Sequence, residues 1–362
     1  MDAELARQHD HADALRAGCS HSVHFLVREL CWRSFLWFRR RADQRVVGLA
    51  LGLGVPVSVL IPRGNQPLDP LSPVPAALHC VHMTVTLGQI VALLDGFYPP
   101  ATALSWDRVG LVTGDPDQPI THVRFAVDPT LAVIEEAIAD GADLLVTHHP
   151  LLLRGIHSVA TTTAKGRAVT RAVVADLAIL CAHTNADVAD PGVCDALAAA
   201  CGLVDTEPLD IEQGQGVGRV GRLAQPTTLR AFAEGLAAAL PPTNVGVRVS
   251  GDPDAQVCRV AVLGGSGDDR FGAARRSGVD VYVTADLRHH PALEAREESS
   301  FGPPYLIDAG HYATEWLWLS GAAARLSQAL AEQGTTVETS ISTLRTDPWD
   351  FLVGVNADGG TP

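Results

Sequence analysis

The sequence predicts an α/β protein with two similar α/β lobes, each a mostly parallel sheet covered by helices. Short, fully apolar runs alternate with longer segments of helical character along most of the chain. Strands that are apolar on both faces are typical of parallel sheets that helices cover on both sides. The same strand–helix–strand pattern also occurs twice, in residues 122–150 and in residues 258–291. The alternative is a chance similarity, since strand–helix–strand units are common.

Both copies of the pattern have the same internal order. A short apolar strand leads into a helix that ends at a glycine, Gly141 in the first copy and Gly278 in the second, and another apolar strand follows. Glycine just beyond a helix end readily adopts the left-handed conformation that terminates the helix. The predicted strands are Val123–Val127, Asp143–Thr147, Val260–Leu263 and Asp280–Thr284. A third apolar strand then appears in each half, within LAILCAHTNAD (177–187) and YLIDAGHYATE (305–315).

The composition excludes several classes of protein. A hydrophobic share of 47% with 19% charged residues, over 362 residues, excludes a wholly disordered chain. The net charge of −14 argues against a dedicated nucleic-acid binder, which needs a basic surface, and the 5% aromatic content argues against stacking on single strands. The seven cysteines include no CxxC pair, so neither a zinc ribbon nor a disulfide framework is indicated. We expect a reduced, cytoplasmic protein without a secretory leader.

The first 82 residues differ from the rest of the chain. They contain nine arginines against seven acidic residues, and a proline-rich tail follows the apolar stretch Val46–Pro62. That stretch is shorter than the roughly 20 residues that a membrane-spanning helix needs, although a short membrane anchor is an alternative interpretation. We predict residues 1–82 to be a disordered extension, or sequence upstream of the true start. The predicted folded part comprises a first lobe (83–206), a connecting segment (207–257) and a second lobe (258–362).

Histidine and carboxylate residues follow three of the predicted strands. Functional groups in open α/β sheets collect at the carboxyl ends of strands, where the loops open. In the third segment, a helix beginning near Tyr312 would put a histidine and a glutamate four residues apart on one face. Four of the eight histidines after Met83 lie at these strand ends, so we predict that they converge. The residues concerned are His148, His149, His183, Asp187, His311 and Glu315.

Each of these motifs, taken alone, has an ordinary structural explanation. An isolated His-His pair can simply be exposed, Asn and Asp are common turn residues, and a His and Glu four residues apart can form a surface pair. Taken together, mixed imidazole and carboxylate ligands suit zinc, manganese, iron or cobalt rather than a structural thiolate site. Two histidine-rich strand ends and a carboxylate able to bridge indicate two metal ions, roughly 3.5–4 Å apart.

Six motifs, in order along the chain, carry a resemblance to a known family. They are SWDRVGLVTGDP (105–116), LLVTHHPLLLRGIHS (144–158), AHTNADVADPGVCDALA (182–198), VYVTADLRHHPALEA (281–295), LIDAGHYATE (306–315) and TDPW (346–349). In these motifs the chain resembles the GTP cyclohydrolase 1 type 2 family, also called Nif-three-like dinuclear metal-binding proteins. The resemblance extends from Met83 to about Phe351 and does not touch the first 82 residues.

The resemblance implies two intertwined α/β lobes, a dinuclear metal site in the cleft between them, and a toroidal homohexamer. The family's ligands carry over onto His148, His149, Asp187, His311 and Glu315. The implied split gives His149, Asp187 and Glu315 to one ion, and His148, His311 and Glu315 to the other. The chain departs from the family's usual TGDLK at residues 284–288, which read TADLR and leave the ligands intact.

The resemblance also implies a reaction. Two divalent ions would activate a water that attacks a nucleotide such as GTP, opening the guanine imidazole ring at C8 with loss of formate. Histidines not bound to metal, chiefly His183 and His290, are the predicted proton shuttles, because imidazole titrates near neutral pH. Two alternatives stay open: a two-metal phosphoesterase or metabolite hydrolase, and a non-enzymatic metal-binding or regulatory ring protein. We expect a small-molecule substrate, no dedicated nucleic-acid binding and no membrane association.

Overall fold

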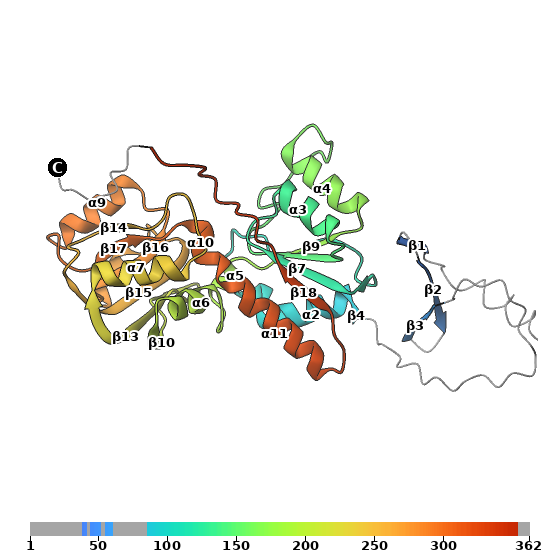
Figure 1. The fold of residues 1–362 in the computed structure, drawn as a ribbon, viewed down its shortest axis with the longest axis horizontal. Helices are drawn as coiled ribbons and strands as arrows, with labels where there is room; N and C mark the ends of the chain where they lie inside the picture. Colours follow the sequence, from blue (N-terminus) through green and yellow to red (C-terminus); the bar gives the residue numbers. More distant parts are fainter. Residues whose placement is uncertain (1–37, 42–43, 52–54, 61–84, 354–362) are drawn as a thin grey trace, which may run out of the picture. The chain divides into compact units, whose positions relative to one another are not determined.

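The computed structural model describes residues 38–41, 44–51, 55–60 and 85–353, and the chain separates into two compact units, Met1–Met83 and Thr84–Pro362. In the first unit, three strands pair antiparallel in the order β1-β2-β3, namely β1 (Phe38–Arg41), β2 (Gln44–Leu51) and β3 (Val55–Leu60) (Figure 1). The predicted disordered extension therefore contains a small sheet, and the rest of that segment lies outside the described residues. No helix among the described residues is long and apolar enough to cross a membrane.

The first lobe of the second unit is built on a five-stranded sheet with the order β18-β7-β8-β9-β5. Its strands are β5 (Gly110–Thr113), β7 (His122–Ala126), β8 (Leu144–Thr147), β9 (Ala178–Cys181) and β18 (Glu338–Ile341). All neighbours are parallel except β5, which runs antiparallel to β9. Every residue of β7, β8 and β9 is buried, as expected for strands covered on both faces.

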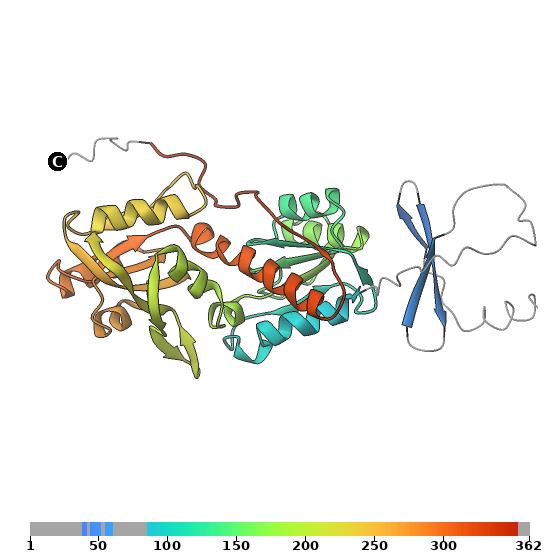
Figure 2. The same ribbon diagram turned by 60° about the horizontal axis from the view of Figure 1, so that its bottom comes forward.

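Helices cover both faces of this first sheet (Figures 1 and 2). On one face lie α3 (Leu131–Ala139) and α4 (Ala164–Val174), and on the other lie α2 (Leu87–Phe97) and α11 (Trp318–Glu332). Helices α2, α3 and α4 each begin after a threonine whose hydroxyl accepts a backbone N–H three residues on, which satisfies an otherwise free donor. A short ladder of β4 (Val85–Thr86) with β6 (Pro119–Ile120) and the 3-10 turn η1 (Pro100–Thr102) complete the lobe.

The second lobe contains a six-stranded sheet with the order β10-β13-β15-β16-β17-β14. Only its centre is parallel, because β10, β13 and β14 pair antiparallel with their neighbours. The strands are β10 (Leu203–Glu207), β13 (Arg219–Thr228), β14 (Arg248–Ser250), β15 (Gln256–Ser266), β16 (Val281–Ala285) and β17 (Tyr305–Asp308). The predicted α/β class with parallel strands is thus confirmed, with antiparallel strands added at both edges of the second sheet.

The two faces of the second sheet have separate cores. Val260 and Val262 of β15 pack with α6 (Val193–Ala200) and α7 (Leu229–Ala239), while Ala261 and Leu263 pack with α8 (Phe271–Arg276) and α9 (His289–Glu298). This alternation along one strand puts helices on both sides of the sheet. A separate hairpin, β11 (Asp210–Glu212) with β12 (Gln215–Val217), stands between β10 and β13.

The chain crosses between the lobes twice, so the lobes are intertwined. The first crossing runs through α5 (Thr184–Asp187) into α6, and the second runs from α10 (His311–Trp316) into α11 and β18, which return to the first sheet. The predicted boundaries are therefore wrong in two places. Much of segment 207–257 belongs to the second lobe, as strands β13 and β14 and helix α7, and the end of segment 258–362 adds β18 to the first sheet. The sequence shows that α11 has an apolar face, but the apolar pattern does not determine against which of the two sheets that face packs.

Each lobe contains an aspartate with the same structural role. The Asp143 carboxylate, just before β8, accepts the backbone N–H groups of Thr121 (2.7 Å) and His122 (3.2 Å) at the start of β7. Asp280, just before β16, accepts those of Cys258 and Arg259, both at 2.8 Å, in β15. Each carboxylate thus ties the beginning of one central strand to the beginning of the next. The internal repeat seen in the sequence therefore extends to a shared hydrogen-bond arrangement.

Replacing Asp143 by alanine should leave buried N–H groups unsatisfied and lower the free energy of unfolding. We expect Asp143→Ala to destabilise the chain by about 1–3 kcal/mol, the usual cost of such groups. Urea denaturation followed by circular dichroism measures this. The exposed Asp117 of the same lobe provides the control, because Asp117→Ala should change stability by less than about 0.5 kcal/mol. Equal effects of the two substitutions would contradict this role of Asp143.

Candidate metal centre

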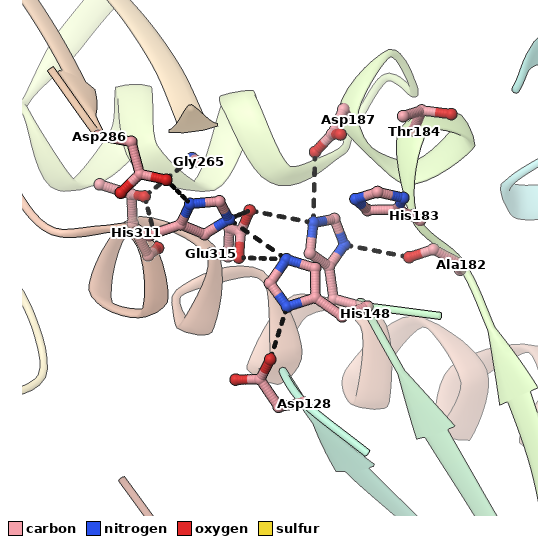
Figure 3. Close-up of polar contacts among 12 residues, drawn as sticks. Asp128, His148, Ala182, His183, Thr184, Asp187, Gly265, Asp286, His311 and Glu315 are labelled. Atoms are coloured by element: carbon pink, nitrogen blue, oxygen red, sulfur yellow. Dashed lines mark hydrogen bonds and ion pairs between the residues drawn. The ribbon is translucent and has the colours of Figure 1, made fainter. Parts of the chain in front are cut away.

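The residues that follow β8, β9 and β17 meet where the two lobes face each other, and Figure 3 shows His148, His183 and His311 gathered there. His148 and His149 follow β8, His183 follows β9, and His311 opens α10 just after β17. Because β8 and β9 are parallel neighbours, their carboxyl ends lie side by side at one edge of the first sheet. The end of β17 in the second sheet lies at the same point, so strand ends of both lobes converge there.

Two glycines allow the second lobe to approach this point closely. Gly310 adopts a φ of +81° just before α10, a conformation that L residues rarely adopt. Gly265, at the end of β15, has a φ of +66°, and a Cβ there would lie 2.4 Å from Glu315 Oε1. Any side chain at residue 265 would therefore collide with the Glu315 carboxylate in its observed position.

Glu315 lies at the centre of the cluster and contacts three histidines. Its Oε1 is 3.0 Å from His311 Nε2 and 3.4 Å from His148 Nε2, and its Oε2 is 3.1 Å from His149 Nε2. On the far side of His148, Asp187 Oδ1 lies 3.6 Å from the same Nε2 atom. One buried carboxylate therefore faces imidazole nitrogens from both lobes, as a bridging ligand would.

All four histidines are oriented by an acceptor at Nδ1. A carbonyl or carboxylate oxygen can only accept, so each Nδ1 donates its proton, and the lone pair of the neutral ring lies on Nε2. This arrangement is typical of metal-binding histidines. His148 Nδ1 donates to the Ala182 carbonyl at 3.1 Å, and His149 Nδ1 donates to the Asp128 carboxylate at 2.7 Å. His183 Nδ1 donates to the Asp107 carboxylate at 2.9 Å, and His311 Nδ1 donates to the Asp286 carboxylate at 2.7 Å.

The sequence interpretation missed these three aspartates as functional residues. Asp107 and Asp286 lie inside the motifs SWDRVG and VTADLR, and Asp128 comes two residues after β7. Asp128 and Asp286 both stand at the carboxyl end of a strand, so the rule that identified the histidines applied to them too. What the sequence lacked was the long-range approach that pairs each aspartate with its histidine.

Two buried polar atoms that form no hydrogen bond support a cation at this point. His148 Nε2 and Asp187 Oδ1 are buried and form no hydrogen bond with any described residue. Burial raises the pKa of Asp187. Burial also acts to raise the pKa of Glu315, but His149, His148 and His311 outweigh it and hold that pKa well below its ordinary value. The cluster therefore favours positive charge among its Nε2 atoms, and its mixed donors suit a divalent transition metal.

The contacts divide the ligands into two groups. His149, His311 and Glu315 bring their ligand atoms within 4.8 Å of one another, and His149 Nε2 is 3.3 Å from His311 Nε2. His148 instead contacts Asp187 and Glu315. The resemblance implies that His149 shares an ion with Asp187 and that His148 shares one with His311. The distances favour the reverse, with His148 beside Asp187 and His149 beside His311.

Comparison with known proteins shows to which family this chain belongs. The profile of the Duf34/NIF3 (NGG1p interacting factor 3) family matches residues 85–348. The chain belongs to the DUF34/NIF3 family. A Streptomyces coelicolor relative named GTP cyclohydrolase 1 type 2 homolog is 49% identical over 268 residues, which cover 73% of this chain and 93% of the relative. The predicted family resemblance is thereby confirmed.

Two crystal structures share the fold of this NIF3 family member. A Bacillus cereus protein related to NIF3 superimposes with a TM-score of 0.67 at 27% identity, covering 73% of this chain and 98% of the other. A Staphylococcus aureus hypothetical protein gives a TM-score of 0.68 at 28% identity, covering 74% and 100%. Both comparisons leave roughly a quarter of this chain uncovered.

The two predicted proton shuttles of this NIF3 protein have different surroundings. The ring of His183 lies 5.1 Å from that of His148 and 5.4 Å from that of His149, so His183 is part of the cluster. Its ligand atoms are also close enough to theirs for a shared ion. His290 is exposed on α9, where its ring packs against His289, and the structure does not bring it to the cluster.

Two pockets border this cluster, and His149 and His311 line both. The metal-side pocket, of about 610 Å³, is lined by His183, Asp187 and Glu315, among others. The back pocket, of about 670 Å³, is lined by the carboxylates that hold the outer nitrogens of His149 and His311 and by others nearby. Its acidic residues are Asp128, Asp286, Asp308 and Asp347.

Removing the charge of Asp128 should weaken metal binding without removing a ligand. We expect Asp128→Asn to lower the affinity for zinc about 10- to 100-fold at one of two sites, because such outer carboxylates orient and polarise the ligand histidine. Competition with a chromophoric chelator measures the affinity. Asp205→Asn is the matched control, since Asp205 pairs with Arg222 on the surface. The role assigned to Asp128 would be wrong if both variants bound zinc as the wild type does.

Proposed function

We propose that this protein binds two divalent ions of zinc, manganese, iron or cobalt per subunit and is a metal-dependent hydrolase of a nucleotide such as GTP. The observation that carries the proposal is the position of Glu315. Its two carboxylate oxygens face His148 and His311 on one side and His149 on the other. The name of the Streptomyces coelicolor relative, GTP cyclohydrolase 1 type 2 homolog, supports the reaction class.

The chain's own residues supply the ligands and the proton transfers. His148, Asp187 and Glu315 would hold one ion, and His149, His311 and Glu315 the other. Two divalent ions in such a site lower the pKa of water and polarise the bond under attack. His183, which lines the metal-side pocket, would accept a proton from the attacking water at Nε2 and return it to the leaving group.

Asp107 would keep His183 in the required tautomer. It binds His183 Nδ1 at 2.9 Å and also accepts the backbone N–H and the hydroxyl of Thr184, at 3.0 and 2.6 Å. Burial acts to raise the pKa of Asp107, but these hydrogen bonds outweigh it, so its pKa is well below the ordinary value. An ionised Asp107 holds the Nδ1 proton and leaves Nε2 as the acceptor.

The proposed reaction is tested by incubating the zinc- or manganese-loaded protein with GTP, other nucleotides and simple phosphoesters. We expect formate release from GTP, and a fall in kcat of about 10²- to 10⁴-fold in His183→Ala, the usual contribution of a general acid or base. The exposed His290 is the control, and His290→Ala should keep wild-type turnover.

Other results of the same assay point to other functions. Phosphate release without formate would contradict ring opening and favour a two-metal phosphoesterase. No turnover with any compound, in a protein whose metal is lost on His148→Ala, would favour a non-enzymatic metal-binding or regulatory protein.

We further propose a toroidal homohexamer in the cytoplasm. The resemblance to a ring-forming family supports the assembly, and the free thiols of Cys181, Cys194, Cys201 and Cys258 fit a reducing compartment. Light scattering on the purified protein should give a mass near six times 38.2 kDa. A monomer or dimer at micromolar concentration would contradict the ring.

A further inference from the structure

The metal-side pocket and the back pocket meet different atoms of the cluster. Asp187, Glu315 and His183 line the metal-side pocket and do not line the back pocket. Asp128 and Asp286, which occupy the Nδ1 nitrogens of His149 and His311, line the back pocket and not the metal-side pocket. The ligand atoms are therefore reached from the metal-side pocket.

The charges of the two pockets also differ. Each pocket is lined by four acidic side chains, but the back pocket has one cation, Arg248, which is already paired with Asp308, and the metal-side pocket has two. In the metal-side pocket, Arg270 is paired with Glu212, whereas Lys165 is exposed and forms no hydrogen bond or ion pair with any described residue. The metal-side pocket therefore differs from the back pocket in one unpaired cation, Lys165, with which an anionic group of a substrate can pair.

An exposed aromatic side chain stands at the metal-side pocket. Trp106 lines this pocket with 52% of its surface exposed, and its ring lies 5.8 Å from that of His183, at a steep angle of 78°. Leu153, also exposed, lines the same pocket. A planar ring of a ligand can pack against these large apolar side chains and remove their surface from water, which favours binding.

The backbone on both sides of Trp106 is held firmly. Leu104 N donates to Thr184 Oγ1 at 3.0 Å, and Asp107 binds both the N–H and the hydroxyl of the same threonine. Ser105 N donates to Gln213 Oε1 at 3.3 Å, in the β11–β12 hairpin. Trp106 is thus presented on a turn anchored at three of its residues, so little conformational freedom is lost when a ligand stacks on it.

From these contacts we propose that Trp106 is a substrate-binding residue, on which a planar heteroaromatic ring of an anionic substrate stacks in the metal-side pocket. The ring would lie beside His183 and within reach of the metal ligands, and the anionic group would meet Lys165. This inference rests on the proposed function for its substrate, but it concerns binding and not turnover.

The test measures binding of guanosine 5′-monophosphate to the full, zinc-loaded chain by calorimetry, with ribose 5-phosphate as the probe that lacks a ring. We expect Trp106→Ala to weaken nucleotide binding about 5- to 150-fold, the range that stacking of one base on one aromatic side chain gives. Trp106→Phe should retain most of the affinity. Binding of ribose 5-phosphate should be weaker in the wild type and unchanged in both variants.

The matched control is Trp349→Ala. Trp349 is 61% exposed and lines the back pocket, so its removal deletes the same side chain on the other pocket of the cluster. Equal zinc content and thermal stability of the variants would show that they are folded. The proposal is overturned if Trp106→Ala binds the nucleotide as the wild type does, if Trp349→Ala loses as much affinity, or if the wild type does not prefer the nucleotide to ribose 5-phosphate. A lack of turnover with stacking intact would contradict only the hydrolase reaction.

Discussion

The buried carboxylate of Glu315 is the constraint on which the site depends. A carboxylate removed from water is costly unless positive charge compensates it. Here three imidazoles approach it within 3.0–3.4 Å, two from the first lobe and one from its own helix in the second. The intertwined chain brings these imidazoles to Glu315, because α10 follows β17 of the second sheet and runs directly into α11, which packs on the first sheet. Fold and site therefore have one common cause.

Around this carboxylate, hydrogen bonding directs every histidine inward. Each ring is held at Nδ1 by an oxygen acceptor, so its remaining nitrogen faces the cluster. The two lobes solve the problem in the same way, with a histidine followed four residues later by a carboxylate: His183 with Asp187, and His311 with Glu315. The repeat visible in the sequence thus extends from the strands to the ligands. The metal-side pocket is lined by the ligands Asp187 and Glu315, whereas the back pocket is lined by Asp128 and Asp286, which hold the Nδ1 atoms of His149 and His311.

The strand-end rule singled out the four histidines, Asp187 and Glu315, but not the three aspartates that hold the histidine rings at Nδ1. It could not pair histidines with carboxylates, because which histidine faces Asp187 depends on how the lobes pack. The second copy of the repeat also contains a His-His pair, but four residues separate Thr284 from His289, whereas His148 follows Thr147 directly, so the second pair begins helix α9. The antiparallel edges of the second sheet and the return of β18 rest on long-range pairings that local periodicity does not encode.

Anomalous diffraction from crystals of the zinc- or manganese-loaded protein tests the central claim most directly. We predict two anomalous peaks, roughly 3.5–4 Å apart, with Glu315 touching both. One peak should lie against His148 and Asp187, and the other against His149 and His311. The absence of any peak among these five side chains would contradict the metal centre and the chemistry proposed for it.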